Sequence, residues 1–146
     1  MENLKIEYLK LKDMEQYKNL IDQCFGNSNE VEYYKTQYKK KNENLGIIVA
    51  KQNNKIIGSI TYYQINLFTF SFQPALELFN VAVLEEYRGN RVAELLLDFV
   101  IDFAKENKYK SIYLTCLDTA YSAHRFYEKV GFEKKGSLKY SLDIET

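Results

Sequence analysis

Hydrophobic and polar positions along the chain follow a pattern that predicts a mixed α/β domain. Alternation or short apolar runs predict strands over residues 6–11, 46–51, 55–63, 76–84 and 111–117. Apolar residues at helical spacing predict helices over residues 13–24, 30–41, 92–103 and 120–130. A last pair of short strands is expected over residues 132–144. The resulting order, βααβββαβαββ, contains no repeat or linker, so residues 1–146 are expected to form a single domain.

Polar and aromatic residues between these segments predict how the elements begin and end. Asp13 is expected to cap the first helix, and Gly131 to end the last one. The run Lys39–Lys41 is expected to be the solvated C-terminus of the second helix rather than a nucleic-acid patch, because cations suit that end of the helix dipole.

The aromatic segment 68–74 is expected to extend a strand and pack on the core, with the lining of a substrate pocket as the alternative.

The stretch 76–97 combines a buried strand, a polar turn and the start of a helix. Its turn contains Gly89, which lets a backbone approach a ligand closely, and two arginines, Arg88 and Arg91. A helix that begins directly after a strand presents unpaired N–H groups and the positive end of its dipole, so a phosphate or pyrophosphate is the expected ligand. The alternative is an ordinary connection with two solvated arginines. A P-loop and a dinucleotide fingerprint are excluded because the chain contains neither motif.

Composition narrows the class of protein further. Lys+Arg and Asp+Glu are both 20, so the formal net charge is zero and no whole-chain attraction to nucleic acid is expected. Cys24 and Cys116 have no second thiol or histidine at metal-ligand spacing and are expected to be buried and reduced, with a disulfide or a metal site as the alternative. No signal-like segment or membrane-length apolar run is present. These features predict a cytoplasmic protein without a membrane or nucleic-acid partner.

Two motifs resemble the GNAT superfamily of acyl-CoA-dependent N-acetyltransferases: the loop 88–93 and the run 123–132, which contains Phe-Tyr and ends in Gly-Phe. The order of elements also matches over essentially the whole chain. In the family loop, Gln/Arg-x-x-Gly-x-Gly/Ala, Arg88 and Ala93 take the first and last positions, but Arg91 stands where the family has glycine. Arg91 must therefore turn outward or place its guanidinium on the phosphates. The resemblance implies the GNAT fold, a mostly antiparallel mixed sheet flanked by helices and splayed at the acyl-CoA site.

The resemblance also implies a donor site and a catalytic acid. The backbone of Val81, Ala82 and Val83 would pair with the pantetheine of acetyl-CoA. The pyrophosphate would bind the backbone of Arg88, Gly89, Asn90, Arg91, Val92 and Ala93. Tyr127 matches the family tyrosine that protonates the leaving thiolate, and a phenol with a pKa of about 10 can stabilise a thiolate whose acid has a pKa near 8.5. The alternative is that Tyr127 only packs under the sheet.

An acceptor amine must lose a proton before it attacks, because an aliphatic ammonium has a pKa of about 10 and no lone pair. Glu77 lies four residues before Val81, where several family members carry a glutamate that acts as base through water. Strand alternation places Glu77, Phe79 and Val81 on one face. The alternative is a solvent-facing acid. Thr115 stands where protein N-terminal acetyltransferases of the family carry a glutamate, which argues against a ribosomal-protein acetyltransferase.

The sequence also differs from the family pattern at the start of the last predicted helix. Ala120 stands where many family members have an asparagine that forms a hydrogen bond to pantetheine. Asp118 or Thr119 can take over this hydrogen bond, and one of the two is also expected to cap the last helix. His124 is expected to be a partly exposed helix histidine, with a role near the thiol as the alternative.

The implied function is transfer of an acetyl group from acetyl-CoA to a primary amine of a small molecule or peptide. The amine would attack directly, without a metal or covalent enzyme intermediate, in a monomer or homodimer. The alternative is a catalytically inactive acyl-CoA-binding module, motivated by Arg91 and Ala120.

Overall fold

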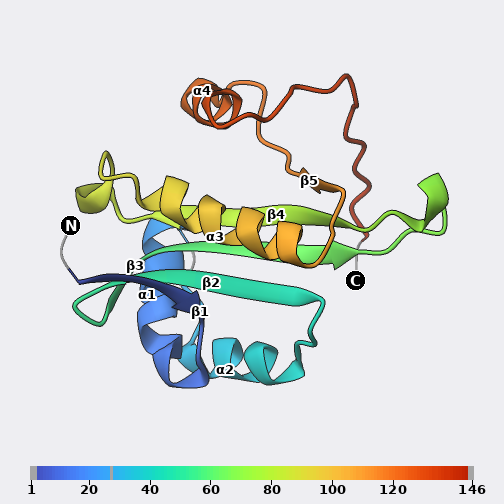
Figure 1. The fold of residues 1–146 in the computed structure, drawn as a ribbon. Coiled ribbons are helices and arrows are strands. Elements are labelled where there is room, and N and C mark those ends of the chain that lie inside the picture. The colour runs from blue at the N-terminus through green and yellow to red at the C-terminus, as the bar shows by residue number, and fades with distance from the viewer. Residues whose placement is uncertain (1–2, 27, 145–146) are drawn as a thin grey trace. The chain divides into compact units, whose positions relative to one another are not determined.

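The computed structural model describes residues 3–26 and 28–144 (Figure 1). These described residues form two compact units, with the boundary between Thr115 and Cys116. The first unit contains one five-stranded sheet in the order β1-β2-β3-β4-β5. Neighbouring strands from β1 to β4 are antiparallel, whereas β5 runs parallel to β4. The predicted mixed, mostly antiparallel sheet is therefore confirmed. The strands are β1 (Leu4–Tyr8), β2 (Leu45–Gln52), β3 (Lys55–Ile65), β4 (Ala75–Val83) and β5 (Ser111–Tyr113).

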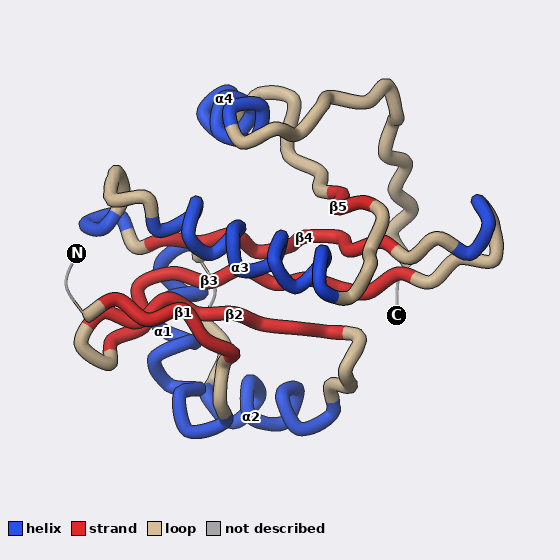
Figure 2. The backbone as a smooth tube through the Cα atoms, viewed as in Figure 1, coloured by secondary structure: helices blue, strands red, loops and turns tan. Residues whose placement is uncertain are grey.

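Helices cover both faces of this sheet (Figure 2). On one face, Tyr62 of β3 stacks on Phe103 with ring centroids 4.9 Å apart. On the other face, the hydroxyl of Tyr17 lies beside those of Ser59 and Thr61. The helices are α1 (Met14–Phe25) and α2 (Val31–Lys40) on the Tyr17 side and α3 (Val92–Glu106) on the Phe103 side. The three helices predicted in this unit are confirmed within two or three residues of their expected ends.

Strands β2 and β3, which lie close to their predicted ranges, form a hairpin that closes through Asn53 and Asn54. Both residues have positive φ, 49° and 68°, as the two central positions of a type I′ turn require. Asparagine adopts this left-handed backbone more readily than most residues. The pair Asn53-Asn54 therefore sets the register that brings the two strands together.

Asp13 takes the predicted N-cap position of α1, but its side chain makes no capping hydrogen bond. Its carboxylate instead accepts a 2.7 Å bond from the Nζ of Lys51, which also pairs with Glu7 at 2.9 Å. The lysine is buried, and a buried ammonium needs such partners. The expected cap is therefore replaced by an ion pair that ties α1 to β2.

The aromatic segment differs from its prediction. A short 3-10 turn, η2 (Phe70–Phe72), interrupts it, and Phe68 and Phe72 are 87% and 65% exposed. Ser71 and Phe72 have φ of 60° and 58°, a left-handed conformation that ends an extended strand. The expected extension into the core is therefore wrong. Two further short 3-10 turns are η1 (Leu11–Asp13), which follows a strand shorter than predicted, and η3 (Glu85–Tyr87).

The second unit contains the helix α4 (Tyr121–Lys129). Ala120 is its N-cap residue and no side chain caps it, so the expected cap from Asp118 or Thr119 is wrong. Gly131 follows the helix with φ of 109°, as predicted. The two strands expected over 132–144 are not formed. The alternating apolar residues there are exposed and lack the covering layer that stabilises a strand: Leu138, Tyr140, Leu142 and Ile144.

Candidate functional site

Strand β4 contains a β-bulge at its centre. Phe79 pairs with Thr61, and Ala82 pairs with Ser59. Between these two pairs β4 contains one more residue than β3, which defines the bulge. Asn80, within the bulge, has φ of 53°. The extra residue shifts the alternation, so that Ala82 rather than Val81 lies on the face of Phe79. The prediction that Val81 shares a face with Glu77 is therefore wrong, because regular alternation does not survive a bulge.

Beyond this bulge β4 has an open edge. Strand β5 pairs with β4 only over Ala75–Glu77 (Figure 1). From residue 78 to residue 83, no strand among the described residues pairs with β4 on that side. The Val83 carbonyl there accepts hydrogen bonds from Arg88 Nε at 3.1 Å and Cys24 Sγ at 3.6 Å. Among the described residues, the edge of β4 next to Val81 thus has no strand partner on the side away from β3.

The loop that follows β4 leads directly into α3. Gly89 and Arg91 both have positive φ, 83° and 64°, and Arg91 is the N-cap residue. The Leu95 N–H donates to the Arg91 carbonyl at 3.0 Å, so the N–H groups of Val92 and Ala93 precede the first helical hydrogen bond. Such N–H groups at a helix N-terminus suit an anion. The backbone geometry of this turn therefore fits a phosphate group.

The Arg91 side chain points outward into solvent, which is one of the two orientations expected from the sequence. Its Nε donates to Glu94 Oε2 at 2.8 Å, and its side chain is 70% exposed. The left-handed backbone at this position explains why glycine is the favoured residue of the family loop. Asn90 closes the same turn by donating to the Tyr87 carbonyl at 3.2 Å. The Arg91 guanidinium is thus paired with a carboxylate of the first turn of α3 while most of the side chain is exposed to solvent.

Glu77 lies among aromatic rings on the α1/α2 face of the sheet. The register places it between Tyr63 of β3 and Tyr113 of β5, and Phe79 follows two residues later. Tyr63 and Phe79 meet edge to face with centroids 5.3 Å apart. All three rings are 39–53% exposed, and Glu77 is half-buried. A carboxylate surrounded by accessible ring faces suits an alkylammonium group.

Tyr127 lies on α4 in the second unit. Its ring makes edge-to-face contacts with Phe126 and Phe132, at centroid distances of 5.2 and 5.5 Å. Burial raises the pKa of Tyr127 above the ordinary phenol value, and the neighbouring Cys116 thiol raises it further. The hydroxyl therefore keeps its proton through the neutral and mildly alkaline range, as a proton donor must.

The structure also tests the predictions for His124 and for the two cysteines. His124 is half-buried, and its Nε2 lies 2.7 Å from the Leu117 carbonyl, so this histidine closes the loop before α4. Cys116 is exposed, so its predicted burial is wrong, whereas Cys24 is half-buried. The short β5 ends before Cys116, which removes the covering that a longer strand would have provided.

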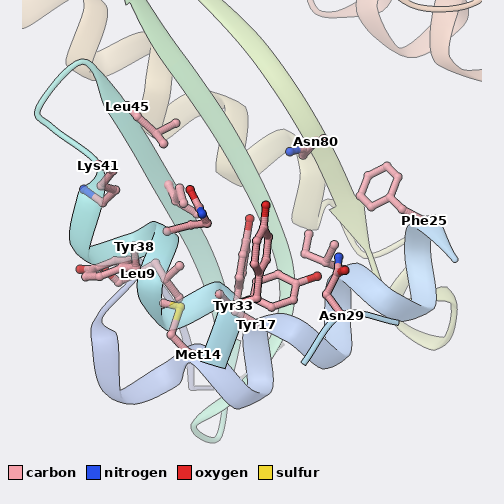
Figure 3. A pocket seen from close by; sticks show the side chains of 14 residues that line it. Leu9, Met14, Tyr17, Phe25, Asn29, Tyr33, Tyr38, Lys41, Leu45 and Asn80 are labelled. Carbon is pink, nitrogen blue, oxygen red and sulfur yellow. The ribbon is translucent and has the colours of Figure 1, made fainter. Parts of the chain in front are cut away.

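A pocket of about 400 Å³ opens between α1, α2 and the sheet (Figure 3). Asn80 of the β4 bulge lines it, together with tyrosines of both helices. Sequence reasoning did not identify this pocket. The signal available was the tyrosine spacing along α2, where Tyr34 and Tyr38 lie four residues apart and share a helix face.

In the part of the chain that the structure describes, no group of three or more His, Cys, Asp or Glu side chains is arranged to hold a metal ion. Over the same residues, every helix is too short or too polar to cross a membrane.

Comparison with solved structures confirms the fold. A transcriptional regulator from Bacillus halodurans C-125 superposes with a TM-score of 0.84 at 24% identity, covering 96% of this chain and 100% of that one. Glucosamine-6-phosphate N-acetyltransferase from Arabidopsis thaliana superposes with a TM-score of 0.81 at 21% identity, covering 99% and 100%. At these identities the likeness concerns the fold alone. It is the fold of the acetyltransferases to which the two sequence motifs point.

Comparison of sequences identifies the family. The model of the acetyltransferase (GNAT) family matches residues 14–132, and the chain belongs to this family. Human N-acetyltransferase 8B is 30% identical over 88 residues, which is 60% of this chain and 38% of that protein. Rat N-acetyltransferase family 8 member 2 is 28% identical over 94 residues, 64% of this chain and 41% of that protein. The chain thus matches about two fifths of the length of these curated relatives.

Proposed function

We propose that the protein transfers an acetyl group from acetyl-CoA to a primary amine. The observation that carries this proposal is the open edge of β4 directly before the first turn of α3. Beyond Glu77, β4 has no strand partner among the described residues on the side away from β3, so the outward-facing peptide groups around Val81 can pair with the pantetheine amides. The N–H groups of Val92 and Ala93, with the turn through Gly89, offer a site for the pyrophosphate. Val83 contributes less, because Arg88 and Cys24 already engage its carbonyl.

The acceptor amine is proposed to approach β4 from the face that carries Glu77. The carboxylate attracts the incoming ammonium, and the accessible ring faces of Tyr63, Phe79 and Tyr113 attract the same ammonium through cation–π contacts. Glu77 then takes the ammonium proton, directly or through water, and leaves the nitrogen lone pair free.

In the transfer step the amine nitrogen forms a bond to the acetyl carbon, and the carbon–sulfur bond of the thioester breaks. The electron pair of that bond leaves with sulfur as the CoA thiolate. Tyr127 is proposed to donate its phenolic proton to this thiolate, and its raised pKa keeps that proton available. The acetylated nitrogen, which is positively charged after the attack, loses its second proton to water, and the tyrosinate regains a proton from water, so the products are the neutral amide and the CoA thiol. The step needs no metal ion and forms no acyl-enzyme.

A second candidate, an acyl-CoA-binding module without transfer activity, is favoured by the departures at Arg91 and Ala120. Ala120 has no side chain that can hold pantetheine. The position of the Arg91 side chain weakens this candidate, because the side chain is 70% exposed and its guanidinium is paired with Glu94.

Release of free CoA thiol from acetyl-CoA in the presence of a panel of primary amines tests the proposal. The proposal predicts amine-dependent thiol release that Tyr127→Phe lowers roughly 100-fold while leaving acetyl-CoA affinity unchanged. Saturable binding of acetyl-CoA without transfer to any amine would favour the inactive module.

A further inference from the structure

The pocket between α1, α2 and the sheet reaches the functional strand. Leu45 and Ile47 of β2 form part of its wall, and Asn80 brings it to the β4 bulge (Figure 3). Its volume of about 400 Å³ lies within the range of roughly 300–1,000 Å³ found for small-molecule sites. Because Asn80 directly precedes Val81, a ligand in this pocket ends beside the strand segment proposed to hold the acetyl donor.

Aromatic rings dominate the helix side of the pocket. The Tyr38 hydroxyl donates to the Leu9 carbonyl at 2.9 Å, and the Tyr34 hydroxyl donates to Asp22 Oδ1 at 3.4 Å. With these hydroxyls engaged by the protein, the residues contribute mainly ring surface to the pocket. The aromatic lining consists of Tyr17, Tyr33, Tyr34 and Tyr38, together with Phe25.

The charge of the lining excludes one class of amine. Among the described residues that line the pocket, Lys41 is the one whose side chain is charged at neutral pH. Its Nζ lies 5.1 Å from the ring centroid of Tyr38. A ligand with several ammonium groups would meet this lysine and no carboxylate of the described lining, which disfavours binding. A single ammonium can remain outside the pocket, at β4.

We propose that this pocket holds the body of the acceptor, and that the acceptor is a monoamine on an aromatic or branched apolar body. This inference rests on the proposed acetyl transfer. The body lies against the tyrosine rings and the aliphatic residues of β2, where burial of its apolar surface provides the affinity. Its amine extends past Asn80 toward the open edge of β4.

Calorimetric titration with 2-phenylethylamine and with spermidine, both without acetyl-CoA, tests this inference. Tyr33 is suited to substitution because it lines the pocket yet is 58% exposed, so the fold tolerates its loss. We expect 2-phenylethylamine to bind more tightly than spermidine. Tyr33→Ala is expected to weaken 2-phenylethylamine roughly three- to tenfold, whereas the matched control Tyr33→Phe, which keeps the ring, leaves its affinity unchanged.

The outcomes separate this inference from the proposed function. Tighter binding of spermidine, or binding of 2-phenylethylamine that is insensitive to Tyr33→Ala, overturns the assignment of the pocket. Acetylation of spermidine alone would overturn the assignment while leaving acetyl transfer intact. Ring-dependent binding of 2-phenylethylamine with no acetylation of any amine would support the pocket and count against the transfer reaction.

Discussion

Replacement of Gly58 by alanine tests how closely β3 approaches the first turn of α3, which presents the proposed phosphate site. A Cβ at this position would lie 2.9 Å from Val92 Cγ1, 3.1 Å from the Ala82 carbonyl oxygen and 3.2 Å from Leu96 Cδ1. Val92 and Leu96 are 2% and 0% exposed, so neither side chain has free space into which to move. The carbonyl is part of β4 and cannot rotate away.

The size of the effect follows from these distances. Carbon atoms pack best at about 3.5–4.0 Å, so α3 must retreat from β3 by roughly half an ångström or more. Overpacking of this kind costs about 1–3 kcal/mol. Because Val92 begins α3 and Ala82 lies on β4, the same displacement widens the proposed donor site. We therefore expect Gly58→Ala to lower both the free energy of unfolding and the affinity for acetyl-CoA.

Urea unfolding followed by circular dichroism measures the change in stability. Gly136→Ala is a matched control, because no atom lies within 4 Å of a Cβ built there, and it should change the free energy of unfolding by at most about 0.5 kcal/mol. If Gly58→Ala also left the free energy of unfolding within about 0.5 kcal/mol of the parent protein, the close packing of α3 on β3 would be refuted.

Three further predictions concern single side chains. Lys51→Met should destabilise the protein by about 3 kcal/mol in urea unfolding, because it leaves the buried Asp13 carboxylate without its partner; an unchanged midpoint would contradict the ion pair. Arg91→Gly should change acetyl-CoA affinity less than about threefold in calorimetry, since the guanidinium binds Glu94, and a tenfold loss would show that it holds the phosphates instead. Burial raises the pKa of Tyr127 above that of an ordinary phenol, about 10, so any loss of kcat through Tyr127 ionisation should have its midpoint above that pH; a midpoint below about pH 9 that Tyr127→Phe abolishes would contradict this role.

The order and types of elements in the first unit could be predicted because each has a periodic apolar pattern that its own burial requires. The central strand and the helix after it are examples, since Leu76, Leu78 and Leu96 all enter the core. The turn at Asn53-Asn54 carried its own local signal. For these elements, local propensity and tertiary packing favour the same structure.

Other features depend on contacts that no local pattern contains. Asp13 has the sequence of a helix cap, yet it binds a lysine 38 residues away. The bulge at Asn80 moves Val81 to the other face of β4, which alternation cannot foresee. The segment 132–144 alternates like a strand but forms none, because a strand also requires a partner.

The donor site was predicted by motif and remains a proposal, supported by two backbone features. The positive φ of Arg91 shows why the family favours glycine there, and the short β5 leaves the edge of β4 open. The pocket lined by Tyr33 was not predicted, because its residues come from separate elements and each has an ordinary helical environment.

Calorimetric titration of the protein with acetyl-CoA, with ATP as the control, tests the central claim most directly. ATP carries phosphates but no pantetheine, so it can occupy the turn before α3 without using the open edge of β4. The account predicts saturable binding of acetyl-CoA that is much tighter than any binding of ATP. Equal affinity for the two ligands, or no binding of acetyl-CoA, would contradict the assignment of the open β4 edge as the donor site.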